Sequence, residues 1–495
     1  MKISNTVKNN RNKEIGHVAS FFSGVARIQG LPNTFLHEVL IDEADVPIAI
    51  VVGFDENLVD ALFFDDKFDL ERPIFRSFIP FSIQTSDSLV GRIVDGLGRS
   101  IDGMGNVRGK MSPVFQQAPA IIDRKPVTTP FSTGIKIIDT NLPLGRGQRQ
   151  LIIGDRKLGK STIAIDTVLN QKHTDPSVYC IYVICGQKEQ KIRELISLFE
   201  ENNTFLYTIV VSAPASASFA EQYLAPFVGC TIGEYFRDSG KDALVVYDDL
   251  SKHAKVYRDI SLLLERAPGR ESYPGDIFSL HAGLLERASQ LSDKKGAGTL
   301  TALPIIETQE GDITSFIPTN IISITDGQIY LENGLFQKGF LPAVNVGLSV
   351  SRVGSQAQPK ILKEVVSGIR LDLAQHKELQ KLSQLETVVS NEAKKKIHRG
   401  DLILEILKQG KHTNIEWYEQ TILFYAVEQG FFDDIKKEKW SNFEILLLEL
   451  MRNRYAKVLN KIKGGVFNEK IKIEIQEIVK DFKQEFLLIE EKQQS

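Results

Sequence analysis

The run GDRKLGKS, residues 154–161, fits the phosphate-binding pattern G-x-x-x-x-G-K-[ST]. An apolar segment expected to be a strand, Gln150–Ile153, precedes it, and a segment of helical period, Ser161–Gln171, follows it. In that setting the glycines let successive backbone N–H groups point at phosphate oxygens, and the helix N-terminus adds partial positive charge. We therefore predict a P-loop that binds ATP or ADP, with Lys160 at the β and γ phosphates and Ser161 holding Mg²⁺. The predicted nucleotide contacts in and just after this segment are Gly154, Asp155, Arg156, Lys157, Leu158, Gly159, Lys160, Ser161 and Thr162.

A magnesium ion in such a site needs a carboxylate from a neighbouring strand. The segment 244–249, LVVYDD, is an apolar run that ends in two acids. Acids at a strand end are commonly turn residues, but beside a P-loop they fit the metal shell. We predict Asp248 as the principal metal partner, with Asp249 acting through water.

The pattern of strands and helices divides the chain into three expected domains after a polar, flexible tail at residues 1–14. Residues 15–82 contain short β-rich runs with turn signals, which indicate a small β-barrel. Residues 83–358 alternate apolar strands, such as Cys180–Cys185 and Ala243–Tyr247, with helical segments, which is typical of a P-loop α/β nucleotide-binding domain with a parallel sheet. Residues 359–495 are rich in Leu, Ile, Lys and Glu at helical spacing and predict an α-helical C-terminal domain.

Composition excludes several classes of protein. The 495 residues carry 60 Lys+Arg against 63 Asp+Glu, a net charge of −3, so there is no global basic field for nucleic acid. The longest apolar runs are far shorter than the 18 or so residues that cross a bilayer, and the N-terminus lacks a signal peptide's apolar core. Three cysteines cannot build a disulfide framework and are expected to be buried thiols in a reducing cytosol.

Longer motifs extend beyond the P-loop, and together they resemble the α subunit of F1-type rotary ATP synthases. They comprise GRGQR at 145–149, GEYFRD at 233–238, YDDLSK at 247–252, PGRESYPGD at 268–276 and PAVN at 342–345 with SVS at 349–351. The resemblance is dense from about residue 83 to 358 and thinner beyond 380. It implies a barrel crown, a nucleotide-binding core and a helical base.

The resemblance also implies partners. Three such chains would alternate with three catalytic β-type chains around a γ-type central shaft, with a peripheral stalk or other motor components attached. No nucleic acid and no direct membrane insertion are expected. The complex would be cytoplasmic and peripheral at the inner face of the cell membrane.

Further site residues follow from the same resemblance. Gln187 stands where catalytic β subunits have a glutamate that polarises the attacking water, so a largely non-catalytic, ATP-retaining pocket is implied, although some GTPases orient water with a glutamine. Arg352 matches the arginine that α presents to the neighbouring β site, where a guanidinium fits the charge that develops on the γ-phosphate. Phe336 matches an aromatic beside the nucleotide, and Gln409 one of two glutamines near the adenine.

The sequence departs from the family pattern at several places. Lys157-Leu158 replaces Gln-Thr in the P-loop, Leu341 replaces an arginine, and Lys411 replaces the second adenine-side glutamine. An acidic rotor-facing loop is not recognisable in ETVVSNE at residues 386–392. Two interpretations within the family therefore stay open: a standard proton-coupled ATP synthase α subunit, or a diverged F1-like motor ATPase of the gliding-associated type found in some wall-less bacteria, which these departures favour slightly.

Three alternatives come from other classes. A structural pseudo-subunit that binds no nucleotide is compatible with the changed pocket. An RNA translocase of the terminator type would need a basic RNA path and stacking aromatics. A secretion-type homohexameric ATPase would need a glutamate where Gln187 stands.

Overall fold

The computed structural model describes residues 14–65, 67–173, 177–383 and 391–494. The chain divides into two compact units. The first comprises residues 1–127, 146–164 and 172–328, and the second residues 128–145, 165–171 and 329–495. Both the β-rich N-terminal region and the P-loop therefore lie in the first unit. The boundaries predicted after residues 82 and 358 stay predictions. Apart from Glu14, the predicted tail at 1–14 lies outside the described residues.

The N-terminal region of the first unit is an antiparallel six-stranded sheet that closes on itself. Its order is β1-β2-β5-β4-β3-β6, and Gly16 and Ile74, just before the first and the last strand, exchange two backbone hydrogen bonds of 2.8 and 2.9 Å. The interior is filled by small, branched and aromatic side chains such as Ala26, Val51 and Phe63. The predicted barrel is confirmed. Its strands are β1 (His17–Phe22), β2 (Val25–Gln29), β3 (Glu38–Ile41), β4 (Pro47–Phe54), β5 (Leu58–Phe63) and β6 (Phe75–Pro80).

A parallel sheet forms the centre of the first unit. Six of its strands lie in the order β12-β16-β15-β13-β14-β8, and every neighbouring pair is parallel. Their side chains are buried almost throughout, as expected of strands covered on both faces. The strands are β8 (Ile93–Asp95), β12 (Leu151–Gly154), β13 (Val178–Gln187), β14 (Thr208–Pro214), β15 (Asp242–Asp248) and β16 (Thr299–Glu307).

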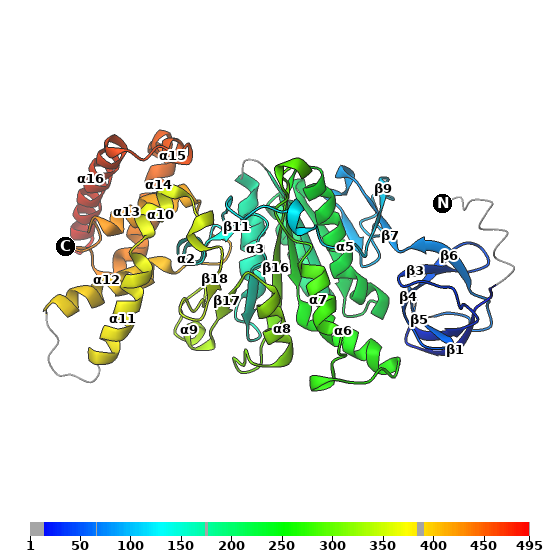
Figure 1. Cartoon of the computed structure of the whole chain (residues 1–495). Helices are drawn as coiled ribbons and strands as arrows, with labels where there is room; N and C mark the ends of the chain where they lie inside the picture. The colour runs from blue at the N-terminus through cyan, green and yellow to red at the C-terminus, as the bar shows by residue number, and fades with distance from the viewer. Residues whose placement is uncertain (1–13, 66, 174–176, 384–390, 495) are drawn as a thin grey trace. The chain divides into compact units, whose positions relative to one another are not determined.

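Helices pack on this sheet and connect its strands (Figure 1). The longest in this unit, α5 (Phe219–Asp238), contacts β13, β14, β15 and β16. Gly229 lets it approach closely, because a Cβ at that position would lie 2.2 Å from a methyl group of Val183. The others are α3 (Lys160–Asn170), which begins in this unit, α4 (Glu189–Glu201), α6 (Leu250–Leu263), α7 (Ile277–Leu285) and α8 (Phe316–Ile324).

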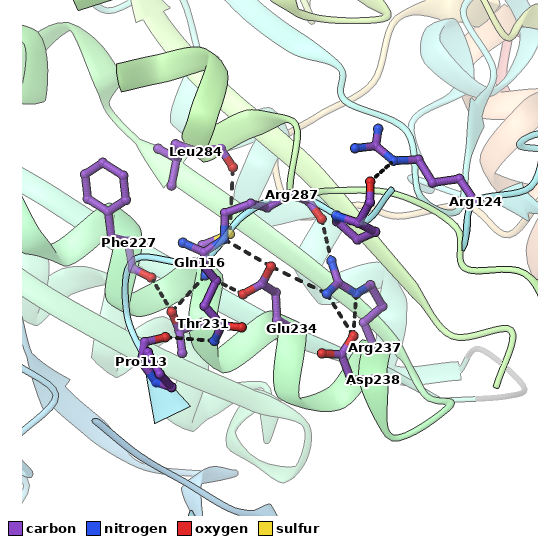
Figure 2. Close-up of polar contacts among 12 residues, drawn as sticks. Pro113, Gln116, Arg124, Phe227, Thr231, Glu234, Arg237, Asp238, Leu284 and Arg287 are labelled. Carbon is purple, nitrogen blue, oxygen red and sulfur yellow. Dashed lines mark hydrogen bonds and ion pairs between the residues drawn. The ribbon is translucent and has the colours of Figure 1, made fainter. Parts of the chain in front are cut away.

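A buried ion pair joins α5 to the chain that follows α7 (Figure 2). The Arg287 guanidinium is 1 % exposed; it donates to Glu234 Oε1 at 3.0 Å, to Thr231 Oγ1 at 2.9 Å and to the Val114 carbonyl at 2.9 Å. Arg237 donates to the Arg287 carbonyl at 2.5 Å. The buried charges of Arg287 and Glu234 are therefore compensated by each other and by these hydrogen bonds, and removing one partner leaves the other charge poorly compensated.

The second unit is mainly helical, which confirms the prediction for the C-terminal region. Its core is aromatic: Trp440, Phe443 and Phe432 are fully buried, and the Trp440 indole donates to the Ile435 carbonyl at 2.9 Å. Its main helices are α10 (Lys360–Val366), α11 (Ile369–Ser383), α12 (Asn391–Leu407), α13 (Trp417–Glu428), α14 (Trp440–Arg454), α15 (Ala456–Lys463) and α16 (Glu469–Gln494).

The three cysteines, Cys180, Cys185 and Cys230, are free and buried, as expected. Burial raises the pKa of each thiol, so all three stay protonated. Within the described ranges, no helix is long and apolar enough to cross a membrane.

Replacing Arg287 by alanine removes the closest cation of the buried Glu234 carboxylate and leaves only Arg237, whose Nη2 lies 3.5 Å from Glu234 Oε1. We expect Arg287→Ala to cost about 3–5 kcal/mol of stability, the usual range for breaking a buried pair. Thermal unfolding of the full chain measures it. The control is Arg193→Ala, which removes an exposed ion pair on α4 and is expected to change stability by less than about 1 kcal/mol. Equal melting temperatures for the two variants would contradict this prediction.

A pair of buried histidines in the first unit makes stability depend on pH. His253 Nδ1 lies 3.2 Å from His281 Nε2, and His253 Nε2 lies 3.0 Å from the Tyr223 carbonyl. The carbonyl requires a proton on His253 Nε2, so His253 Nδ1 accepts from His281 Nε2–H and both rings are neutral. Burial lowers the pKa of His253 to about 4 and that of His281 to about 3.

Because both pKa values are below the unfolded value of about 6.5, the unfolded chain binds more protons between pH 6.5 and 3. The contribution of the two neutral histidines to stability is therefore fully present above pH 7, and it is lost as the pH drops through this window. We expect His281→Phe to show a smaller fall in melting temperature between pH 7 and pH 5 than the wild type. The exposed His17 gives the control, His17→Asn, because water hydrates its ring in both states. Identical pH slopes for wild type and His281→Phe would refute the assignment.

Candidate functional site

The carboxyl ends of β12, β16, β15 and β13 meet at one edge of the parallel sheet. In open α/β sheets this is the edge at which ligands bind. The register places Gly154 opposite Glu307, and Ile184 opposite Asp248. The P-loop, both acids of the 244–249 segment and Gln187 are thereby brought together at this edge.

The P-loop leaves β12 at Gly154 and enters α3 at Lys160. The Lys160 ammonium is folded back against the loop: Nζ donates to the Gly154 carbonyl at 2.8 Å and to the Asp155 carbonyl at 2.6 Å. Burial lowers the pKa of Lys160, while Glu307, Asp249 and Asp248 act in the opposite direction. A buried cation among acids, at a helix N-terminus, is an arrangement suited to a phosphate group. Ser161 and Thr162 follow in the first turn of α3 and are half-buried.

The variable positions of the loop differ in exposure. Lys157 is exposed and has a left-handed backbone, with φ of 64°, whereas Leu158 is buried. Compared with the family's Gln-Thr, Lys157 therefore adds a solvent-facing positive charge to the loop, and Leu158 adds a buried apolar side chain.

The end of β16 is tied to the P-loop by contacts that the sequence patterns above do not indicate. Asp155 Oδ1 accepts from Thr308 Oγ1 at 2.6 Å and from the Gly311 N–H at 2.8 Å. Glu307 pairs with Arg156 at 3.0 Å. Although burial acts against it, Arg156 and Lys160 lower the pKa of Glu307. Glu307 is thus an acid of the site that the sequence patterns miss.

The two acids at the end of β15 have different surroundings. Asp248 accepts from the Tyr182 hydroxyl at 2.9 Å and from Gln187 Nε2 at 3.0 Å. Asp249 caps α6: its Oδ1 accepts from the Lys252 N–H at 2.9 Å, and its Oδ2 lies 2.9 Å from Lys252 Nζ. Burial raises the pKa of Asp249, and Lys252 opposes that shift. The contact of Asp248 with Tyr182 is a second feature that the motifs do not reveal.

The donor set fits magnesium bound together with a nucleotide. Across the described ranges, no group of three His, Cys, Asp or Glu side chains forms a preformed metal cage. Mg²⁺ is usually held by one or two carboxylates together with substrate phosphates and water, so the Ser161 hydroxyl and the Asp248 carboxylate are suitable oxygen donors. Their role as metal partners stays a prediction, as does that of Asp249 through water.

The other predicted residues lie in the second unit. Arg352 follows the short strand β18 (Val350–Ser351) and is exposed. Ser351 fixes the backbone there, because its hydroxyl donates to the Pro143 carbonyl at 2.8 Å and accepts from the Gly354 N–H at 3.1 Å. Within the described part of the chain, Arg352 has no acidic partner.

Phe336 and Gln409 are placed differently from each other. Phe336 lies on the short helix α9 (Asn333–Gln337) and is 41 % exposed. The Gln409 amide is engaged by the backbone: Oε1 accepts from the Lys136 N–H at 2.9 Å, and Nε2 donates to the Gly134 and Thr413 carbonyls at 2.8 and 2.7 Å. Both of its N–H donors are therefore in use within the chain, and its predicted contact with adenine stays a prediction.

Two further departures from the family pattern also lie in the second unit. The Leu341 side chain is 43 % exposed, and its carbonyl accepts from the Gln409 N–H at 2.8 Å. Lys411 is exposed. Most of the segment 386–392 lies outside the described residues, so the structure adds nothing about a rotor-facing loop there.

Together, the parallel sheet, the Gly154–Ser161 loop and the acids at the same edge define a P-loop nucleotide-binding protein. Comparison with known proteins gives the family. The model of the ATP synthase alpha/beta family, nucleotide-binding domain, matches residues 134–351, and that of the ATP synthase alpha/beta chain, C-terminal domain, matches residues 358–482.

Several bacterial proteins named ATP synthase subunit alpha are similar over nearly their whole length. The chain is 47 % identical to that of Aquifex aeolicus over 479 residues, which is 96 % of this chain and 95 % of the relative. It is 47 % identical to that of Helicobacter acinonychis over 451 residues, 91 % of this chain and 89 % of the relative. It is 45 % identical to that of Helicobacter pylori strain Shi470 over 473 residues, which is 95 % of this chain and 94 % of the relative. The chain therefore belongs to the ATP synthase alpha/beta family, among the F1 α subunits, and the resemblance found in its sequence is confirmed.

Proposed function

We propose that this chain retains Mg-ATP without hydrolysing it and donates Arg352 to the catalytic site of a neighbouring β-type subunit. Membership of the family makes it a subunit of an ATP synthase or hydrolase complex. The proposed assembly is an α3β3 ring around a γ-type shaft, peripheral to the inner face of the membrane. A peripheral stalk or other motor components would complete it.

The observation that carries the non-catalytic role is the contact of Gln187 with Asp248. A carboxamide has no basic site near neutral pH and cannot take a proton from water. Here its Nε2 donates to Asp248 at 3.0 Å, so the side chain is directed at the metal-binding acid. A group in this arrangement supports binding of the metal-nucleotide complex and offers no general base.

Exposure supports the role of Arg352. The Arg352 side chain is exposed, and it has no acidic partner among the described residues. Its guanidinium is therefore available to a neighbouring subunit. Its planar fork matches the oxygens of a transferring phosphoryl group.

The kind of complex to which this subunit belongs has two candidates, a standard proton-coupled synthase and a diverged motor ATPase. Identity of 45–47 % over nearly the whole chain to named synthase subunits favours the standard proton-coupled synthase. The changes at Lys157-Leu158, Leu341 and Lys411 favour the diverged motor ATPase. Affinity purification of the native complex distinguishes them, since only the synthase would bring down the proton-channel ring and stalk.

Purified complex is expected to contain ATP in this subunit, since a pocket without a base does not consume it. Lys160→Met removes the ammonium and should abolish that ATP. Chromatography of nucleotides released from the denatured complex measures both, with the β-type site inactivated so that ATP there does not confuse the count. A wild-type subunit that carries no nucleotide would instead establish the structural pseudo-subunit.

Arg352→Ala should reduce ATP turnover of the assembled complex by about 10³-fold or more, as removal of other arginine fingers does. ATP retained by this chain should not change. Steady-state ATPase assays and nucleotide analysis measure the two effects. Arg370→Ala, which removes another exposed arginine of the second unit, is the control and should leave turnover intact. Retention of most turnover by Arg352→Ala would refute the proposal.

A further inference from the structure

Both oxygens of the Asp248 carboxylate are held by uncharged donors. The Tyr182 hydroxyl donates to Oδ2 at 2.9 Å, and Gln187 Nε2 donates to Oδ1 at 3.0 Å. All three side chains are buried. Because the two bonds reach different oxygens, they fix the rotation of the carboxylate as well as its position. Neither donor neutralises its charge, so the negative charge remains available to a cation.

The sheet register explains how Tyr182 reaches Asp248. Ile184 on β13 lies directly opposite Asp248 on β15. Tyr182 is two residues earlier and therefore shares the face of the sheet with both. Its ring packs edge-on against Phe199 of α4, with centroids 5.7 Å apart, and Phe199 is fully buried. The packed ring and the hydrogen bond to Asp248 together hold the phenol toward the carboxyl end of β15.

Gln187 is aimed by a local irregularity at the end of β13. The register between β13 and β14 shifts between Cys185 and Gln187. Gly186 within this shift has φ of 64°, a conformation that favours glycine. The Gln187 carbonyl is held by the Ala215 N–H at 2.9 Å. A turn at Gly186 and a hydrogen bond to the Gln187 carbonyl therefore set the backbone of the residue that donates to Asp248.

We infer that Tyr182 and Gln187 are a pair of positioning residues that orient Asp248 for the Mg²⁺ of the bound nucleotide. The inference rests on the proposed function and adds a residue, Tyr182, that the P-loop motifs do not contain. A carboxylate can accept about four hydrogen bonds, so two acceptor sites remain for metal-bound water. An acid that is already oriented loses no freedom when the metal binds, and residues behind a metal partner commonly tune affinity in this way.

A purely structural role for Tyr182 makes a different prediction from a positioning role. A buried hydroxyl that only satisfies a buried carboxylate would affect folding, and its removal would alter ATP binding equally with and without the metal. A residue that acts through Asp248 affects binding only when Mg²⁺ is present and only while Asp248 is an acid. The two roles can therefore be separated in a single set of variants.

The experiment follows the loss of radiolabelled ATP from the full-length chain, in Mg²⁺ and in EDTA. We expect Tyr182→Phe to lose Mg-ATP about tenfold faster than the wild type, the effect of one hydrogen bond to a charged group. In EDTA the two rates should agree. Asp248→Asn should also lose Mg-ATP faster, and adding Tyr182→Phe to it should have no further effect, because positioning requires the acid.

Two additional variants make the outcome decisive. Tyr179→Phe removes a hydroxyl from the same strand, on a ring that stacks on Phe236, and should behave as the wild type. Gln187→Met removes the second donor at nearly constant volume and should reproduce the magnesium-specific loss, which covers the case in which Tyr182→Phe lowers stability.

Three results would overturn the inference: Tyr182→Phe and Gln187→Met with wild-type rates in Mg²⁺, equal acceleration in EDTA, or additive effects of Tyr182→Phe and Asp248→Asn. A wild-type chain that retains no ATP in Mg²⁺ would overturn the proposed function and this inference together.

Discussion

The buried Lys160 ammonium is the constraint around which the nucleotide site is organised. A cation taken out of water must be compensated, and here two backbone carbonyls and the acids Asp248, Asp249 and Glu307 supply the compensation. Each acid comes from the carboxyl end of a strand or from the residue that follows it. The order of the parallel strands therefore determines the electrostatics of the site. A phosphate group that binds there exchanges carbonyl contacts of the lysine for stronger ionic ones.

The surroundings of Asp248 at the same edge of the sheet bear on the proposed non-catalytic role. The donors around Asp248 are a phenol and an amide. Burial, with the nearby Asp248 charge, raises the pKa of Tyr182, so the phenol stays a donor. Both neighbours of Asp248 thus donate hydrogen bonds to it, and neither is a base that takes a proton from water near neutral pH. Under the proposed function, this edge of the sheet would hold the nucleotide without a group that activates water.

Much of the fold follows directly from the sequence. The apolar runs at Cys180–Cys185 and Ala243–Tyr247 lie within β13 and β15, and the P-loop stands between β12 and α3 as its motif predicts. β16 is harder to infer because Pro304 interrupts its apolar run, and proline is disfavoured in a central strand. With that strand, the acid at its end, Glu307, is also missed. Tyr182 looks like one more apolar core residue until the register is known, because only the pairing of Ile184 with Asp248 brings its hydroxyl to the site.

The closed barrel has a consequence for the life of the chain before assembly. The hydrogen bonds between Gly16 and Ile74 join the two ends of the sheet. An open sheet would instead present free strand edges, which are templates for pairing with other chains. The closed barrel leaves no such free edge at its first and last strands. Closure of this small sheet thus removes one route to edge-to-edge aggregation before the subunit meets its partners.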